Sequence, residues 1–178
     1  MTTSTFQLSS QLLVGELLKR ATHKTPNREA FVFGEKRITY KELDHRATAI
    51  AGWLQKNGVE ADDKVGYILK NSLAIVELFY GVALSGGVGV PINFRLTVDE
   101  LEYIINNSDS QILFIDQEYE EVIQLIEDKI PKVKMVIVVG EVSNTPRYMK
   151  YESIFENQIV SALIFFSSFL NLLGSTYY

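Results

Sequence analysis

The chain has 178 residues, of which 47% are hydrophobic and 22% are charged, a composition typical of a globular protein and not of a disordered one. Its 17 basic residues against 22 acidic ones give a formal net charge of -5, which argues against a nucleic-acid partner. Cysteine is absent, which excludes disulfides, thiolate metal sites and cysteine nucleophiles and predicts a cytoplasmic protein.

The first predicted elements are a helix and a hairpin. Residues 1–11 form a polar lead-in without the basic and apolar regions of a secretory signal. A helix is predicted from Leu12 to His23. Two short strands follow, Ala30 to Phe33 and Arg37 to Thr39, which flank a Gly-Glu-Lys turn and predict a hairpin. The apolar side of the first helix is expected to carry Leu13, Leu17 and Leu18.

A second helix has a defined start, end and buried face. Thr39 and Glu42 have the spacing of a capping box, in which each residue bonds the other's backbone, so a helix is predicted after Thr39. It continues to Lys56, and Gly58 is expected to cap its end. Its buried face is predicted from apolar residues at steps of three and four: Leu43, Ala47, Ile50, Ala51 and Leu54.

The middle of the chain predicts a strand, a buried helix and a second strand. Lys64 to Lys70 is a short apolar run of strand type, and Asn71-Ser72 then offers a cap for an apolar helix that continues to Leu84. Because that helix is apolar nearly all round, we expect it to be buried on more than one side. Gly86-Gly87 ends this helix, and Val88 to Ile92 is predicted to be a buried strand. Pro91 indicates that the strand ends there or lies near an edge of the sheet.

The pattern then repeats. Thr97 and Glu100 form a second capping-box pair before a short helix. A strand is predicted from Gln111 to Asp116, a further helix ends near Pro131, and the last strand runs from Met135 to Gly140. The apolar stripes of these two helices are predicted at Leu101, Ile104 and Ile105 and at Val122, Ile123 and Ile126.

Strands that alternate with helices of this length are typical of a parallel sheet with right-handed crossovers. We therefore predict an α/β fold: a parallel sheet of at least four strands, with helices on both faces and a short N-terminal hairpin. Residues 12–156 are expected to form this domain, and residues 157–178 an uncharged hydrophobic tail. Because one fold supports many chemistries, the function has to come from other features.

The residue patterns predict no catalytic, cofactor-binding or metal-binding residue. His23 and His45 have no ligand partner at metal-site spacing and are interpreted as surface residues. The glycines at 86, 87 and 89 stand between a helix and a strand, the reverse of a phosphate loop, and a short GST match at Gly174 to Thr176 lacks a lysine. Surface positions are also predicted for the acidic pairs Asp62-Asp63, Glu120-Glu121 and Glu127-Asp128.

Two blocks carry a family resemblance. ITYKELDHRATAIAGWLQKNGV at Ile38 to Val59 and FYGVALSGGVGVPIN at Phe79 to Asn93 resemble the opening of adenylate-forming ligases, and the similarity continues in order through Asp116. This superfamily includes acyl-CoA synthetases, luciferases and peptide-synthetase adenylation domains. The segment PINFRLTVDELEYIINNSD is more similar to fatty-acyl or aryl CoA ligases than to amino-acid-activating domains. The resemblance covers most of residues 12–156 and implies the N-terminal part of the large ligase domain.

The resemblance implies an ATP-dependent reaction in the parent enzyme. There a carboxylic acid attacks MgATP to give an acyl-adenylate, and coenzyme A then takes the acyl group. The family's Ser/Thr/Gly-rich phosphate loop and its catalytic lysine are missing from this chain, so the sequence leaves its own enzymatic activity open and predicts that it is inactive alone. In the family a strand resembling ALIFF leads into the loop, whereas here Ser161 to Ser168 continues as FLNLLGSTYY. A frameshift, a premature stop or a gene-model error near Ser168 is the expected reason.

Two alternatives concern function and location. The chain is predicted to be a truncated AMP-dependent ligase of fatty acid metabolism; the alternative is a non-enzymatic α/β binding module of ligase ancestry. The apolar run from Ile159 to Leu173 raises the possibility of a membrane anchor, but it is shorter than the roughly 20 residues that a spanning helix needs and is interrupted by polar residues. We instead expect residues 157–178 to promote self-association.

Overall fold

The computed structural model describes residues 14–142 and 146–156. The helices are α2 (Val14–Lys24), α3 (Tyr40–Lys56), α4 (Leu73–Ser85), α5 (Val98–Asn107) and α6 (Glu120–Leu125), with 3-10 turns at Gln117–Tyr119 and Glu127–Lys129. The strands are β1 (Glu29–Phe33), β2 (Lys36–Thr39), β3 (Lys64–Ile68), β4 (Val88–Pro91), β5 (Ile112–Asp116), β6 (Met135–Val139) and β7 (Tyr148–Lys150).

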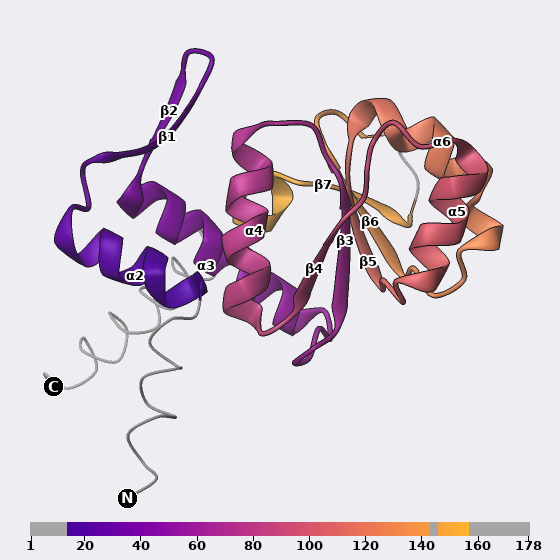
Figure 1. Cartoon of the computed structure of the whole chain (residues 1–178), viewed down its shortest axis with the longest axis horizontal. Helices are drawn as coiled ribbons and strands as arrows, with labels where there is room; N and C mark the ends of the chain where they lie inside the picture. The colour runs from indigo at the N-terminus through magenta and orange to yellow at the C-terminus, as the bar shows by residue number, and fades with distance from the viewer. Residues whose placement is uncertain (1–13, 143–145, 157–178) are drawn as a thin grey trace, which may run out of the picture.

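The centre of the molecule is a five-stranded sheet with the order β4-β3-β5-β6-β7, in which every neighbouring pair is parallel. Helices α3 and α4 lie on one face of this sheet, and α5 and α6 lie on the other (Figure 1). The strands β1 and β2 form a separate antiparallel hairpin that projects from the body. The predicted α/β fold, with its parallel sheet, two helical layers and hairpin, is confirmed.

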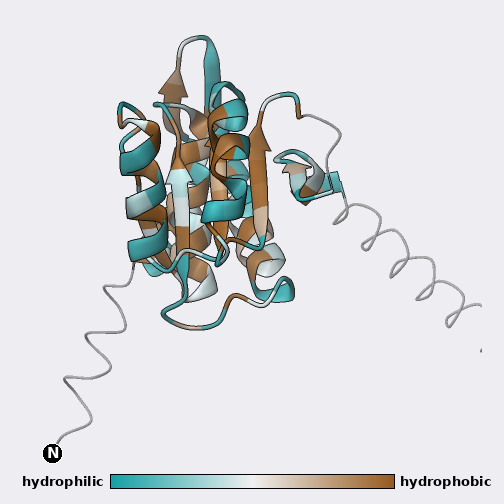
Figure 2. Cartoon of the chain, turned by 90° about the vertical axis from the view of Figure 1, so that its right-hand side faces the viewer, coloured by the Kyte–Doolittle hydropathy of each residue, from teal (hydrophilic) through white to brown (hydrophobic). Residues whose placement is uncertain are grey.

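The central strands are hydrophobic on both sides because each side is covered by helices. Alternate residues of one strand therefore enter different cores, and brown, hydrophobic colouring predominates on several of the strands in Figure 2. The core on the α3 and α4 side contains Val65, Tyr67, Ile112, Phe114 and Ile137. The core on the α5 and α6 side contains Ile68, Leu113, Ile115, Val136 and Val138.

Helix starts follow the predicted caps. Thr39 and Glu42 form the predicted capping box, and the Thr97 N–H donates to the Glu100 carboxylate at 2.8 Å. These bonds from the cap backbone lower the pKa values of both glutamates. At the other end of α3, Gly58 follows the C-cap residue Asn57 with φ of 84°, a left-handed conformation that glycine adopts without strain.

The α3 face was predicted correctly, but the α2 face was not. All five predicted residues of the α3 face are buried. Leu18 is buried as expected, whereas Leu17 is exposed on α2, because α2 contacts the body along a narrow stripe against α3 and α4. Leu12 and Leu13 lie outside the described residues.

The second half of the sheet also departs from the predictions. Strand β4 is largely exposed and not buried, because it is the sheet's edge strand; its Pro91 is compatible with that position. Strand β7, which the sequence did not predict, adds the opposite edge. The predicted helix after Asp116 is confirmed, but only its six middle residues are α-helical, as α6. A 3-10 turn precedes α6 and another follows it.

Candidate functional site

The residues singled out in the sequence do not come together. His23 lies in the last turn of α2 and His45 lies on α3, and both are exposed. Gly86 is the left-handed C-cap of α4 with φ of 89°, which confirms its interpretation as a helix cap. The GST match at residues 174–176 lies outside the described residues.

One acidic pair was wrongly placed on the surface. Glu120 is only 5% exposed, although its neighbour Glu121 is exposed as predicted. The Gln124 side chain approaches Glu120 at 3.4 Å. Glu120 and Ile123 stand three positions apart on α6 and share its buried face, whereas Glu121 faces outward.

The order of the strands creates a crevice at the carboxyl edge of the sheet. The chain leaves β3 toward α4 on one face and leaves β5 toward α6 on the other, and open α/β sheets bind ligands at such switch points. Here protein groups close the crevice. The Lys70 N–H donates to Asp116 at 2.6 Å, and the Lys70 ammonium pairs with Glu118 at 2.5 Å. Burial raises the pKa of Asp116, an effect that the bond from Lys70 opposes.

Beside this crevice lies a groove with a volume of about 730 Å³. Its walls come from the hairpin, from α3, from the start of α4, from the end of β6 and from the segment that follows β7. We call it the carboxyl-edge groove. Its lining includes Phe33, Ile38, Leu73, Val139 and Tyr151 together with the charged residues Glu35, Lys36, Arg37, Glu42, Arg46, Glu77 and Glu152.

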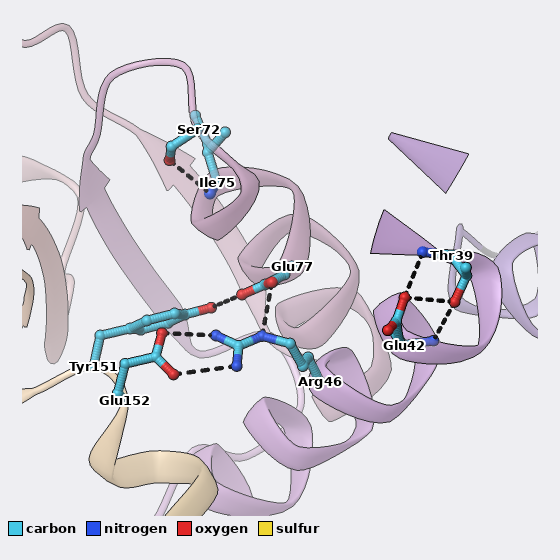
Figure 3. A network of polar contacts seen from close by, with 8 residues as sticks. All are labelled: Thr39, Glu42, Arg46, Ser72, Ile75, Glu77, Tyr151 and Glu152. Carbon is cyan, nitrogen blue, oxygen red and sulfur yellow. Dashed lines mark hydrogen bonds and ion pairs between the residues drawn. The ribbon is translucent and has the colours of Figure 1, made fainter. Parts of the chain in front are cut away.

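A polar network anchored on Arg46 forms one wall of the groove (Figure 3). The Arg46 Nε donates to Glu77 at 2.7 Å, and its terminal nitrogens donate to both oxygens of Glu152 at 2.9 and 3.2 Å. The Tyr151 hydroxyl donates to the other Glu77 oxygen at 2.6 Å. The Arg46 guanidinium also lies 3.7 Å from the centroid of the Phe155 ring. The network therefore attaches the segment after β7 to α3 and α4.

The charges in this network support one another. Glu77 is 3% exposed, so its carboxylate depends on Arg46 and Tyr151 for compensation. Burial acts to lower the pKa of Arg46, but the carboxylates of Glu152 and Glu77 outweigh it and raise the pKa. Burial, and then the charge of Glu77, raise the pKa of Tyr151 well above its ordinary value. Tyr151 consequently remains a neutral donor.

Sequence patterns missed this network because its members are separated by 31, 74 and 106 positions along the chain. One local signal was present. Glu77 is the only ionisable side chain apart from Tyr80 in the α4 sequence LAIVELFYGVALS. A carboxylate in a helix that is apolar on several sides requires a partner from another element.

Two buried tyrosines provide a direct comparison of hydroxyl contributions. The Tyr148 hydroxyl is buried and has no hydrogen-bond partner among the described residues, whereas the Tyr151 hydroxyl donates to Glu77. We expect Tyr151→Phe to lower the free energy of unfolding by about 1.5–3 kcal/mol, because it removes a hydrogen bond to a charged group. Tyr148→Phe is expected to change it by less than about 1 kcal/mol. Urea denaturation at neutral pH measures both; equal losses would contradict the assignment.

The dependence of stability on alkaline pH is a second test of whether the Tyr148 hydroxyl is buried. Burial, and then the charge of Glu127, raise its pKa from 10.0 to about 12. Between these values the unfolded chain releases the proton and the folded chain keeps it, so stability falls as the pH rises. Tyr148→Phe should therefore lose less stability than the unmodified chain in that range. Parallel stability curves for the two proteins above pH 10 would show that the hydroxyl is not buried.

The described residues contain no assembled metal site, and the glycines singled out in the sequence form no phosphate cradle. In residues 14–142 and 146–156, no group of three or more histidine, aspartate or glutamate side chains is arranged to hold a metal ion. The glycines at 86 and 87 end a helix and do not open toward a helix N-terminus, as a phosphate cradle would.

Within residues 14–142 and 146–156, the helices are too short or too polar to cross a membrane.

Comparisons with known proteins agree with the fold. The chain is 31% identical over 140 residues to a medium/long-chain-fatty-acid–CoA/3-oxocholest-4-en-26-oate–CoA ligase of Mycobacterium tuberculosis, covering 79% of this chain and 25% of the relative. It is 35% identical over 121 residues to 4-hydroxybutyrate–CoA ligase 2 of Metallosphaera sedula, covering 68% of this chain and 22% of the relative. The chain thus spans about a quarter of the length of these relatives.

Solved structures show the same arrangement. An anthranilate CoA ligase in complex with anthranoyl-AMP matches with a TM-score of 0.76 at 24% identity, covering 80% of this chain and 27% of that one. A fatty acyl CoA synthetase of Mycobacterium tuberculosis matches with a TM-score of 0.67 at 30% identity, covering 70% and 26%. The family described as AMP-binding enzyme matches residues 18–161, which include every strand of the parallel sheet. The chain belongs to the AMP-binding enzyme family.

Proposed function

We propose that this chain supplies the opening part of the large domain of an AMP-dependent carboxylic acid–CoA ligase. The observation that carries this proposal is the family match over residues 18–161, which coincides with the five-stranded parallel sheet and its two helical layers. In the complete reaction a carboxylate attacks the α-phosphate of ATP and releases pyrophosphate, and the thiol of coenzyme A then displaces AMP from the acyl group. ATP, magnesium and coenzyme A are the cofactors of that reaction.

The contribution of the described residues is a scaffold and not the chemistry. In the carboxyl-edge groove, Arg46 is paired with both Glu77 and Glu152. The proposed substrate class is a fatty or aryl carboxylic acid, which agrees with the names of the relatives. We place the protein in the cytoplasm, in agreement with the absence of cysteine.

The DNA that follows the codon for Tyr178 tests this proposal. It is expected to encode, in the same or another frame, a Ser/Thr/Gly-rich loop that ends in lysine. The reason is that the family's phosphate contacts come from such a loop, which the printed sequence lacks. Downstream DNA with no trace of this loop would favour a non-enzymatic binding module instead.

The purified chain is expected to show no ligase activity. Because the phosphate loop and the catalytic lysine are missing from its sequence, it should not exchange pyrophosphate with ATP in the presence of fatty or aryl acids. The measurement is isotope exchange above a buffer control, with the full-length Mycobacterium tuberculosis ligase as the positive control. Exchange that depends on added carboxylate would refute the assignment of an inactive chain.

We also propose that residues 12–156 fold as one domain and that residues 157–178 promote self-association. Supporting this division, the described structure builds its three hydrophobic cores from residues between Leu18 and Phe155. Residues 157–178 contain no lysine, arginine, aspartate, glutamate or histidine. A long uncharged apolar segment readily recruits other chains.

Deleting residues 157–178 is therefore expected to raise solubility and to leave the α/β core folded. Sedimentation and circular dichroism of the full chain and the deletion variant, at equal concentration, measure the two effects. A deletion variant that unfolds would place the segment in the core. A full chain that sediments only as a monomer at every concentration would refute self-association.

A further inference from the structure

The carboxyl-edge groove has an apolar side that the described residues leave open. Phe31 and Phe33 lie two positions apart on β1 and so share one face of the hairpin. Their cross-strand neighbours on that face are Ile38 and Lys36, and Ile38 is buried against the body. This face is therefore turned inward. Even so, Phe31 and Phe33 are 38% and 48% exposed, because the hairpin projects from the body, and of the two Phe33 lines the groove.

The described chain leads directly to this groove. Tyr151 and Glu152 line it, and residues 153–156 add one helical turn before the segment that begins at Asn157. Phe155 stacks on Arg46, which is itself a lining residue. The start of the segment therefore lies within a few residues of the groove, and each extended residue adds about 3.3 Å of reach.

The composition of residues 157–178 matches this open side. The segment NQIVSALIFFSSFLNLLGSTYY has aliphatic and aromatic side chains and no charged side chain at neutral pH. Covering the two exposed phenylalanines with it would remove apolar surface from water on both partners. The buried carboxylate of Glu77 would not be left unpaired, because Arg46 already bonds Glu77 and Glu152 (Figure 3).

We propose that residues 157–178 of the same chain dock in the carboxyl-edge groove beneath the hairpin. The tether favours this occupant, because a short connection holds a segment at an effective concentration of about millimolar, well above the concentration of other copies in dilute solution. The groove is much smaller than the segment, so apolar surface remains for association at high concentration. This inference does not depend on the proposed ligase function.

Photo-cross-linking of the full chain tests the docking. Phe33 is replaced by p-benzoylphenylalanine, and the matched control carries the same replacement at Tyr103, an exposed aromatic residue of α5 on the opposite side of the sheet. Far-UV circular dichroism checks that both proteins fold. Cross-linked peptides are identified by mass spectrometry from the monomer and dimer bands separately.

The position-33 probe is expected to capture residues 157–178 in the monomer band, with a yield that does not fall when the protein is diluted. The position-103 probe should not cross-link to residues 157–178. A second variant with Leu73→Asp places a charge on the groove wall at the first position of α4, where an acidic residue suits the helix, and should reduce the capture. Capture confined to the dimer band, equal capture from position 103, or no capture by the folded position-33 protein would overturn the proposal.

Discussion

Replacing Arg46 with alanine is expected to lower the free energy of unfolding by about 3–5 kcal/mol, the usual cost of removing one partner of a buried ion pair. The change would leave the Glu77 carboxylate buried with the Tyr151 hydroxyl as its remaining donor in Figure 3. It would also release Glu152 and remove the stacking of Arg46 on Phe155. Because the network joins α3 and α4 to the segment after β7, that segment should lose protection from hydrogen exchange first.

The matched control is Arg37→Ala on the hairpin. Arg37 pairs with Glu29 at 2.7 Å, but both side chains are more than half exposed, so the pair should contribute less than about 1 kcal/mol. Urea denaturation of the two variants gives the comparison. A loss at Arg46 no larger than that at Arg37 would mean that water compensates the Glu77 charge and that the network is not buried in solution.

Phe114→Ala is expected to lower the free energy of unfolding by about 3–5 kcal/mol, because it opens a cavity in the middle of the sheet. Phe114 lies on the central strand β5 and is 0% exposed. Its ring makes edge-to-face contacts with Trp53 of α3 and with Tyr151, at centroid distances of 6.3 and 6.2 Å. The surrounding strands cannot close the space, because they are held by pairing on both sides of β5.

Phe79→Ala is the control for this change. Phe79 lies on α4, is about half exposed and contacts the Tyr80 ring edge-to-face. We expect Phe79→Ala to lower the free energy of unfolding by about 1 kcal/mol, the contribution of an aromatic pair near the surface. Thermal denaturation followed by circular dichroism ranks the two variants. A smaller loss at Phe114 than at Phe79 would contradict the placement of β5 at the centre of the sheet.

Local patterns predicted most of the elements because their causes are local. The capping boxes at Thr39 and Thr97 satisfy backbone groups within three residues, and both appear in the structure. The apolar runs at β3, β5 and β6 are strands because each buries both faces, which a continuous hydrophobic run indicates by itself. Strand β7 escaped prediction because it has three residues and, within the described part of the chain, a single neighbouring strand, so its sequence carries little hydrophobic pattern.

Burial was predicted less well than secondary structure, since it depends on neighbours that are distant in the sequence. Val88 to Ile92 has the composition of a buried strand, but β4 occupies an edge, and most of it is exposed. Glu120 is charged, as surface residues usually are, yet it is buried at the start of α6. In both cases the packing of the element against the rest of the fold decided the environment, and the composition of the segment did not.

The sequence by itself determined the α/β class, the helix caps and the family resemblance, because each rests on residues that are close together along the chain. Tertiary structure alone decided the strand order, which places the ends of β3 and β5 beside one another, and the union of Arg46, Glu77 and Tyr151. The physical reason is the crossover connection. Each helix carries the chain across the sheet, so side chains from α3, from α4 and from the end of β7 meet only after packing.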